Sequence, residues 1–189
     1  MNVTEPEDES WGVLSELPGN PLMWVLILSE MAVFGALFVG FAVMRLLQPA
    51  MFLAGQGSLN IALGGANTLV LVTSGYCAAR AVRARALAGI GASRPWLGAA
   101  MALGACFLAI KGVEYSAKIA LGIGLETNPF WTLFFLMTGF HALHVVMGII
   151  VLAIVGWRNT LANLETGTAF WHMVDLIWLI LFPLVYLLR

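Results

Sequence analysis

The sequence predicts an all-α membrane protein, a bundle of five transmembrane helices. Of its 189 residues, 61% are hydrophobic and only 10% are charged, and the mean hydropathy is +0.93. A soluble domain usually carries about 25% charged residues. The apolar residues also gather in runs of about 20, the length that a helix needs to cross roughly 30 Å of hydrocarbon. These observations exclude an ordinary soluble domain, and no basic run suggests a nucleic-acid partner.

The chain is expected to begin with a short acidic segment, residues 1–21, followed by the bundle, residues 22–189. The acidic segment contains no Lys or Arg, and its carboxylates are Glu5, Glu7, Asp8, Glu9 and Glu16. A secretory signal would begin with positive charge, so this segment is not one. The turn-forming residues 17–21 then lead into the first helix.

Five helices account for the rest of the chain. In order, they are expected at Leu22–Met44, Leu59–Ala79, Trp96–Lys118, Phe130–Gly156 and Ala169–Leu188. Each is hydrophobic around its whole circumference, as expected of helices that face lipid and one another. Open sheets cannot satisfy their backbone groups in lipid, and the short alternating segments of a membrane barrel are absent.

Positive residues in the short loops predict the orientation in the membrane. Five arginines would lie on the same side as the N-terminus: Arg80, Arg83, Arg85 and Arg94 in the second loop, and Arg158 in the fourth. The other side would carry Arg45, Lys118 and Arg189. This asymmetry favours a cytoplasmic N-terminus and a C-terminus outside.

Every predicted helix contains polar residues within its apolar run. The ionisable ones are Glu30 in the first helix, Lys111 and Glu114 in the third, His141 and His144 in the fourth, and His172 and Asp175 in the fifth. The second helix adds Asn67, Thr68, Thr73 and Ser74. Ionisable groups inside a bilayer are costly, and they suggest a functional site.

The depths of these residues suggest which of them meet. At about 1.5 Å of rise per residue, Glu30, His144 and Asp175, and with them His172, could form one cluster between the cytoplasmic half and the middle of the bundle. Lys111 and Glu114 fall in the outer half, three residues apart, a spacing that allows an ion pair on one helix face.

Three interpretations of the histidines and carboxylates stay open from the residues alone. A metal site would need them to converge from different helices, but the di-iron bundle pattern is Glu-x-x-His, whereas the spacings here are His-x-x-His and His-x-x-Asp. A haem site would use one histidine from each of two helices. A structural polar network would satisfy each group through a neighbouring helix or lipid head groups. A small transporter using Glu30 and Lys111 is a further alternative, although no internal repeat is visible.

Two long runs resemble subunit III of the haem-copper oxidases. Residues 138–145 read TGFHALHV, close to the TGFHGLHV run of that family, and residues 170–178 read FWHMVDLIW, close to its YWHFVDVVW run. Three shorter matches occur in the order of the family: Ser29-Glu30 with Phe34, Asn67-Thr68 followed by Thr73-Ser74, and Glu114-Tyr115. Together these matches touch all five predicted helices.

The resemblance implies a non-catalytic role. Subunit III binds no haem or metal, so we expect none in this chain. It packs against the catalytic subunit, which carries haem with iron or copper, and it holds phospholipid in a cleft. Glu30 matches the intramembrane glutamate that reacts with carbodiimide, and His141, His144, His172 and Asp175 match polar positions of the later helices. With Asn67, they are the expected polar or lipid-binding network.

The resemblance also implies a bundle that lacks the first two of the family's seven helices, in a bacterial inner membrane. One departure is Lys111, where the family often has glutamine. The start of the chain, residues 17–30, looks most like the NorE type, which is associated with bacterial nitric oxide reductase. The resemblance therefore implies an accessory subunit of nitric oxide reductase or, alternatively, subunit III of a cytochrome c or quinol oxidase that supports proton uptake.

Overall fold

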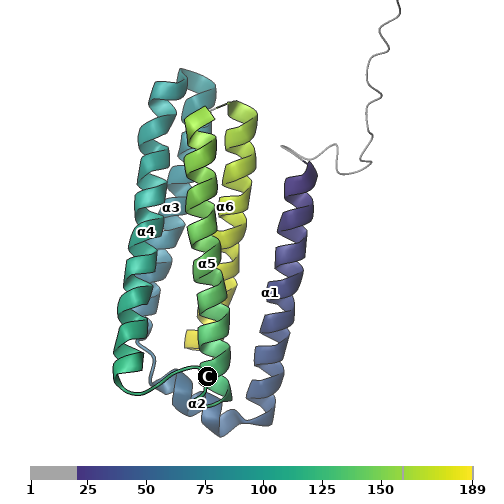
Figure 1. The fold of residues 1–189 in the computed structure, drawn as a ribbon, viewed down its shortest axis with the longest axis vertical. Coiled ribbons are helices and arrows are strands. Elements are labelled where there is room, and N and C mark those ends of the chain that lie inside the picture. Colours follow the sequence, from purple (N-terminus) through teal and green to yellow (C-terminus); the bar gives the residue numbers. More distant parts are fainter. Residues whose placement is uncertain (1–20, 159, 189) are drawn as a thin grey trace, which may run out of the picture.

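The computed structural model describes residues 21–158 and 160–188, and helices are the only regular secondary structure within them (Figure 1). The elements are α1 (Pro21–Leu47), α2 (Pro49–Gly57), α3 (Ile61–Ala88), α4 (Ile90–Ala120), α5 (Pro129–Arg158), α6 (Leu161–Phe182) and the π-helix η2 (Pro183–Leu187). Five helices are long and apolar enough to cross a membrane, with the last running from Leu161 to Leu187. This confirms the predicted fold class. The acidic segment lies outside the described residues, except for Pro21 at its end.

The helices extend well beyond their apolar runs, which corrects several predicted bounds. α3 continues to Ala88 instead of Ala79, and α4 begins at Ile90 instead of Trp96, so the predicted arginine-rich loop is helical. Arginine is a good helix former, and a helix can continue into the head-group region beyond the hydrocarbon. The two helices are joined at Gly89, whose φ of +85° is a conformation that glycine adopts without strain.

Two further bounds differ from the prediction. α6 begins at Leu161, eight residues before the predicted Ala169, because the Thr160 hydroxyl caps it by accepting from the Asn163 amide at 3.3 Å. The predicted loop between the first two spans holds the short helix α2, whose start is favoured by Pro49 at its first position.

α1 lies along one side of the bundle that α3, α4, α5 and α6 form (Figure 1). It contacts α2, α5 and α6, and it buries a narrow stripe of every seventh residue: Ile27, Phe34 and Phe41. Most of its other large apolar side chains are exposed. α1 therefore presents a broad apolar surface to lipid or to another membrane protein.

The core of the bundle is organised around Trp171 of α6, which is fully buried. Its ring lies so close to Gly104 of α4 and Gly148 of α5 that a Cβ atom at either glycine would meet it at 2.6 Å. The Trp171 indole donates to the Ser74 hydroxyl of α3 at 3.2 Å, and Ser74 donates to the Ala100 carbonyl of α4 at 2.7 Å. In lipid, close packing and interhelical hydrogen bonds, more than the hydrophobic effect, hold helices together.

At the end of the bundle where α1 stops, α2 is tied to η2 (Pro183–Leu187). The buried Gln56 side chain donates to the carbonyls of Leu184 and Val185 at 3.2 and 3.1 Å. Carbonyls at the end of a helix have no partner within it, so the Gln56 amide satisfies two groups that would otherwise be left buried or facing lipid.

Candidate functional site

Glu30 of α1 and His144 of α5 form a contact between two helices. The Glu30 carboxylate Oε2 lies 3.0 Å from His144 Nε2, with the side chains 20% and 6% exposed respectively. The contact is close but is not aligned as a hydrogen bond. The His144 ring is also held edge-on by Phe34 and Phe140, with centroids 5.3 and 4.6 Å away. Glu30 is thus anchored on one side and partly open on the other.

The other ring nitrogen defines the tautomer of His144. Nδ1 lies 2.8 Å from the Phe140 carbonyl, which can only accept, so Nδ1 donates. Nε2 then faces the Glu30 carboxyl group. Such a pair can bind a polar head group through the exposed part of Glu30.

A second pair lies on α6, where His172 Nδ1 is 3.6 Å from Asp175 Oδ2. The His172 side chain is 46% exposed, whereas Asp175 is nearly buried against α3. The Asp175 carboxylate lies so close to Gly75 of α3 that a Cβ atom at position 75 would clash with it. The pair lines a shallow groove between α3 and α6, together with Val72, Tyr76 and Leu179. It faces the surroundings of the bundle, not its centre.

His141 and Asn67 are buried in the bundle with unsatisfied polar atoms. Neither ring nitrogen of His141, and neither polar atom of the Asn67 amide, has a hydrogen-bond partner within the described residues. The His141 ring packs against Trp178, Phe107 and Phe34, with centroids 5.2, 5.5 and 6.4 Å away. His141 is therefore a core side chain and contributes to neither pair.

The expected single cluster of Glu30, His144, His172 and Asp175 is thus two separate pairs. Glu30 and His144 join α1 to α5, while Asp175 turns toward α3. The rotation of each helix thus sends these residues to different faces. Within the part of the chain that the structure describes, no three His, Cys, Asp or Glu side chains are grouped as a metal ion would require.

Lys111 and Glu114 of α4 form a buried ion pair, with 2.6 Å between Nζ and Oε2. Tyr186 of η2 completes a triad: its hydroxyl accepts from Lys111 at 3.0 Å and donates to the two Glu114 oxygens at 2.8 and 2.9 Å. Four aromatic rings surround the ammonium with centroids 5.2–5.6 Å away: Tyr115, Phe134, Trp178 and Tyr186. Cation–π contacts of this kind stabilise a desolvated ammonium.

Sequence reasoning missed Tyr186, and it missed the tryptophans of α6 that hydrogen-bond to α3. Trp178 donates to the Thr68 hydroxyl at 3.0 Å, and Trp171 donates to the Ser74 hydroxyl, so two of the three hydroxyls in the Asn-Thr and Thr-Ser matches accept from indole groups of α6. A usable signal existed, because Tyr186 lies near the end of its helix, in the same half of the bundle in which Glu114 was expected. The signal was weak, since depth alone does not say which way a side chain points.

Comparisons with known proteins agree with the motif set. The family model described as cytochrome c oxidase subunit III matches residues 20–189. Cytochrome c oxidase subunit 3 from Synechocystis sp. is 34% identical, over 87% of this chain and 73% of that protein. The same subunit from Thermostichus vulcanus is 35% identical, over 87% and 84%. Subunit 3 of the cytochrome bo(3) ubiquinol oxidase from Pseudomonas aeruginosa is 27% identical, over 87% and 82%.

Proposed function

Because the chain belongs to the cytochrome c oxidase subunit III family, we propose that it is a non-catalytic accessory subunit of a bacterial haem-copper-superfamily complex. In this proposal the partner catalytic subunit holds the haem with its iron or copper. This chain binds neither, and it orders phospholipid and stabilises the partner. Its place is the inner membrane, with the N-terminus cytoplasmic and the C-terminus periplasmic.

The observation that carries the proposal is the family match together with the position of Glu30. This residue sits on the helix with the broadest apolar exposure, and its carboxylate is anchored by His144 yet 20% open. A partly open carboxyl group at this depth suits a hydrogen bond to a lipid or to a facing helix, because an isolated charge there would be costly. His172 and Asp175 supply a second polar pair on another face.

We propose nitric oxide reductase as the catalytic partner. The support is the resemblance of residues 17–30 to the NorE type, together with the length and five spans of the chain. The alternative is a cytochrome c or quinol oxidase core, and the names of the relatives favour that alternative. The two candidates differ only in the partner, so identification of the partner decides between them.

The role of Glu30 is tested with Glu30→Gln, which keeps the size of the side chain but replaces its carboxyl group with an amide. We expect the variant to insert and fold normally, and to retain less bound phospholipid and less catalytic subunit after purification in mild detergent. The matched control is Glu126→Gln, the same change at an exposed carboxylate in the loop between α4 and α5. Full retention of lipid, partner and turnover stability by Glu30→Gln would remove the special role of this residue.

A further inference from the structure

Arginines gather at the end of the bundle where α1 begins. Arg80, Arg83 and Arg85 lie in the last three turns of α3, Arg94 lies in the first two turns of α4, and Arg158 is the last residue of α5. The ends of α3 and α5 and the starts of α1, α4 and α6 are all at this end (Figure 1). Five of the nine basic residues of the chain are therefore placed together.

The positive charge at this end is not balanced by the rest of the bundle. Arg83, Arg94 and Arg158 are exposed, and none of them forms an ion pair with an acid of residues 21–158 or 160–188. In the described helices, the first and last two turns at this end contain a single acidic residue, Glu165 of α6. A surface with such an excess of one sign attracts a partner of the opposite sign.

The complementary charge is in the segment that precedes α1. Half of the ten acidic residues of the chain lie in residues 1–20, which contain no Lys or Arg: Glu5, Glu7, Asp8, Glu9 and Glu16. Because α1 begins at the same end as the arginines, this segment and the arginines share one side of the membrane, whichever way the bundle is inserted. Glu9 precedes Pro21 by 12 residues, which span up to about 40 Å when extended. Packed helices are about 8–10 Å apart, so the whole end of the bundle is within reach.

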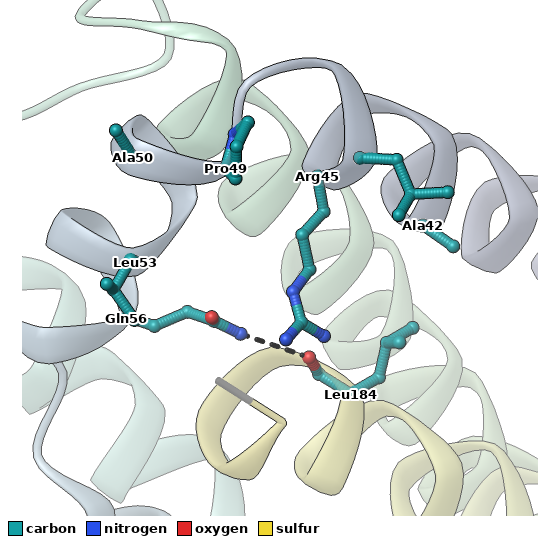
Figure 2. Close-up of a pocket in the computed structure, with 8 residues that line it drawn as sticks. Ala42, Arg45, Pro49, Ala50, Leu53, Gln56 and Leu184 are labelled. Carbon is teal, nitrogen blue, oxygen red and sulfur yellow. Dashed lines mark hydrogen bonds between the residues drawn. The ribbon is translucent and has the colours of Figure 1, made fainter.

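We propose that the acidic segment, residues 5–16, binds across these arginines and fastens the start of α1 to the ends of α3, α4 and α5. α1 is the helix that gains most from such a contact, because it buries only a narrow stripe of its surface. At its far end α1 leads into α2, where Gln56 donates to the Leu184 carbonyl of η2 at 3.2 Å (Figure 2). The acidic segment adds a second attachment at the opposite end of α1.

The strength of this contact comes from many weak pairs acting together. A single pair of exposed charges contributes little, and salt screens it. Here the acidic segment is covalently joined to α1, which gives it an effective concentration in about the millimolar range at the arginines. The same covalent link favours this segment over a free acidic partner. Binding should therefore persist at low salt and weaken at about 1 M salt, where charges are screened beyond about 3 Å.

The test is carbodiimide coupling in the full-length protein, tagged at its C-terminus and purified in mild detergent. Carbodiimide joins a carboxylate directly to a lysine amine that touches it. Arg83→Lys and Arg158→Lys therefore each keep the positive charge and introduce a reactive amine at an exposed position. We expect residues 5–16 to couple to the introduced lysine, as identified by mass spectrometry of the joined peptides. The yield should fall at least about fivefold between low salt and about 1 M salt.

The natural Lys118, in the last turn of α4 at the opposite end of the bundle, is the internal control and should not couple to residues 5–16. Coupling of this segment to the introduced lysine at no higher yield than to Lys118 would overturn the proposal. Coupling that joins only two copies of the chain would also overturn it. Loss of coupling when phosphatidylglycerol is added to the micelles would show that the arginines bind anionic lipid instead, with the same consequence.

A second measurement tests the attachment of α1 without any crosslink. The combined variant Glu5→Gln, Glu7→Gln, Asp8→Asn and Glu9→Gln removes four negative charges outside the bundle, so its helices should fold as in the wild type. We expect faster amide hydrogen exchange in the first turns of α1 and unchanged exchange in α2. Unchanged exchange in the first turns of α1 would overturn the proposal.

Discussion

The triad of Lys111, Glu114 and Tyr186 should show strong energetic coupling when its members are removed singly and together. Glu114→Gln keeps the shape of the side chain but leaves the Lys111 ammonium without its counter-charge. Lys111→Met instead leaves the Glu114 carboxylate without its counter-charge. The double variant, Lys111→Met with Glu114→Gln, removes both charges. We therefore expect each single variant to be less stable than the double variant.

The size of the effect follows from burial and geometry. The two charged side chains are only 3% and 5% exposed and lie 2.6 Å apart, and breaking a buried pair by removing one partner costs about 3–5 kcal/mol. The rings around Lys111 offset part of the loss in Glu114→Gln, so we expect about 3 kcal/mol there. Tyr186→Phe removes only hydrogen bonds to charged groups, worth about 1.5–3 kcal/mol.

The assay is reversible unfolding in mixed micelles, followed by tryptophan fluorescence, because Trp178 contacts the Lys111 ammonium. The predicted coupling between Lys111 and Glu114 is at least about 2 kcal/mol, well above the average of about 0.6 kcal/mol for hydrogen bonds between membrane helices. Single effects that add to the double effect within about 0.5 kcal/mol would refute the account of the pair as a coupled unit.

Two other predictions concern the contacts that hold the helices together. Gly104→Ala should destabilise the bundle by about 1–3 kcal/mol, because the new Cβ atom would meet the Trp171 ring at 2.6 Å. The control is Gly98→Ala on the same helix, which has open space around it and should be neutral or stabilising. Equal free energies of unfolding for the two variants would contradict the reasoning. Gln56→Leu should leave the Leu184 and Val185 carbonyls unsatisfied and lower the free energy of unfolding by about 1–3 kcal/mol. Amide hydrogen exchange should then be faster in η2, while α3 stays protected. Unchanged exchange in η2 would argue against the role of Gln56 in holding η2.

The existence and order of the membrane helices could be predicted from the sequence, because hydrophobic length is a local property. The Lys111–Glu114 pair was likewise accessible, since residues three apart on a helix share one face. The extents of α3 and α4 were not accessible, because hydropathy marks where lipid ends and not where a helix ends. α2 was not predicted for a related reason, because its nine residues are too few to be recognised as a membrane span.

The arrangement of the polar residues depended on helix rotation, which a single sequence does not reveal. Glu30 and His144 were expected at compatible depths and do meet, whereas Asp175, expected in the same cluster, faces α3. Tyr186 joins Glu114 through a side-chain contact between η2 and α4, for which a similar expected depth was the only signal. His141 shows the opposite case: its motif suggested a polar role, whereas aromatic rings enclose it.

The central claim, that this chain is an accessory subunit of a haem-copper-superfamily complex, is tested most directly by its partners. The tagged protein would be purified from native membranes in mild detergent, its partners identified by mass spectrometry, and a reduced-minus-oxidised spectrum recorded. We predict recovery with a haem-bearing nitric oxide reductase core, with all haem assigned to that core. Recovery with an oxidase core would support the accessory role and correct the partner. Recovery of the chain alone, or with haem of its own, would contradict the account.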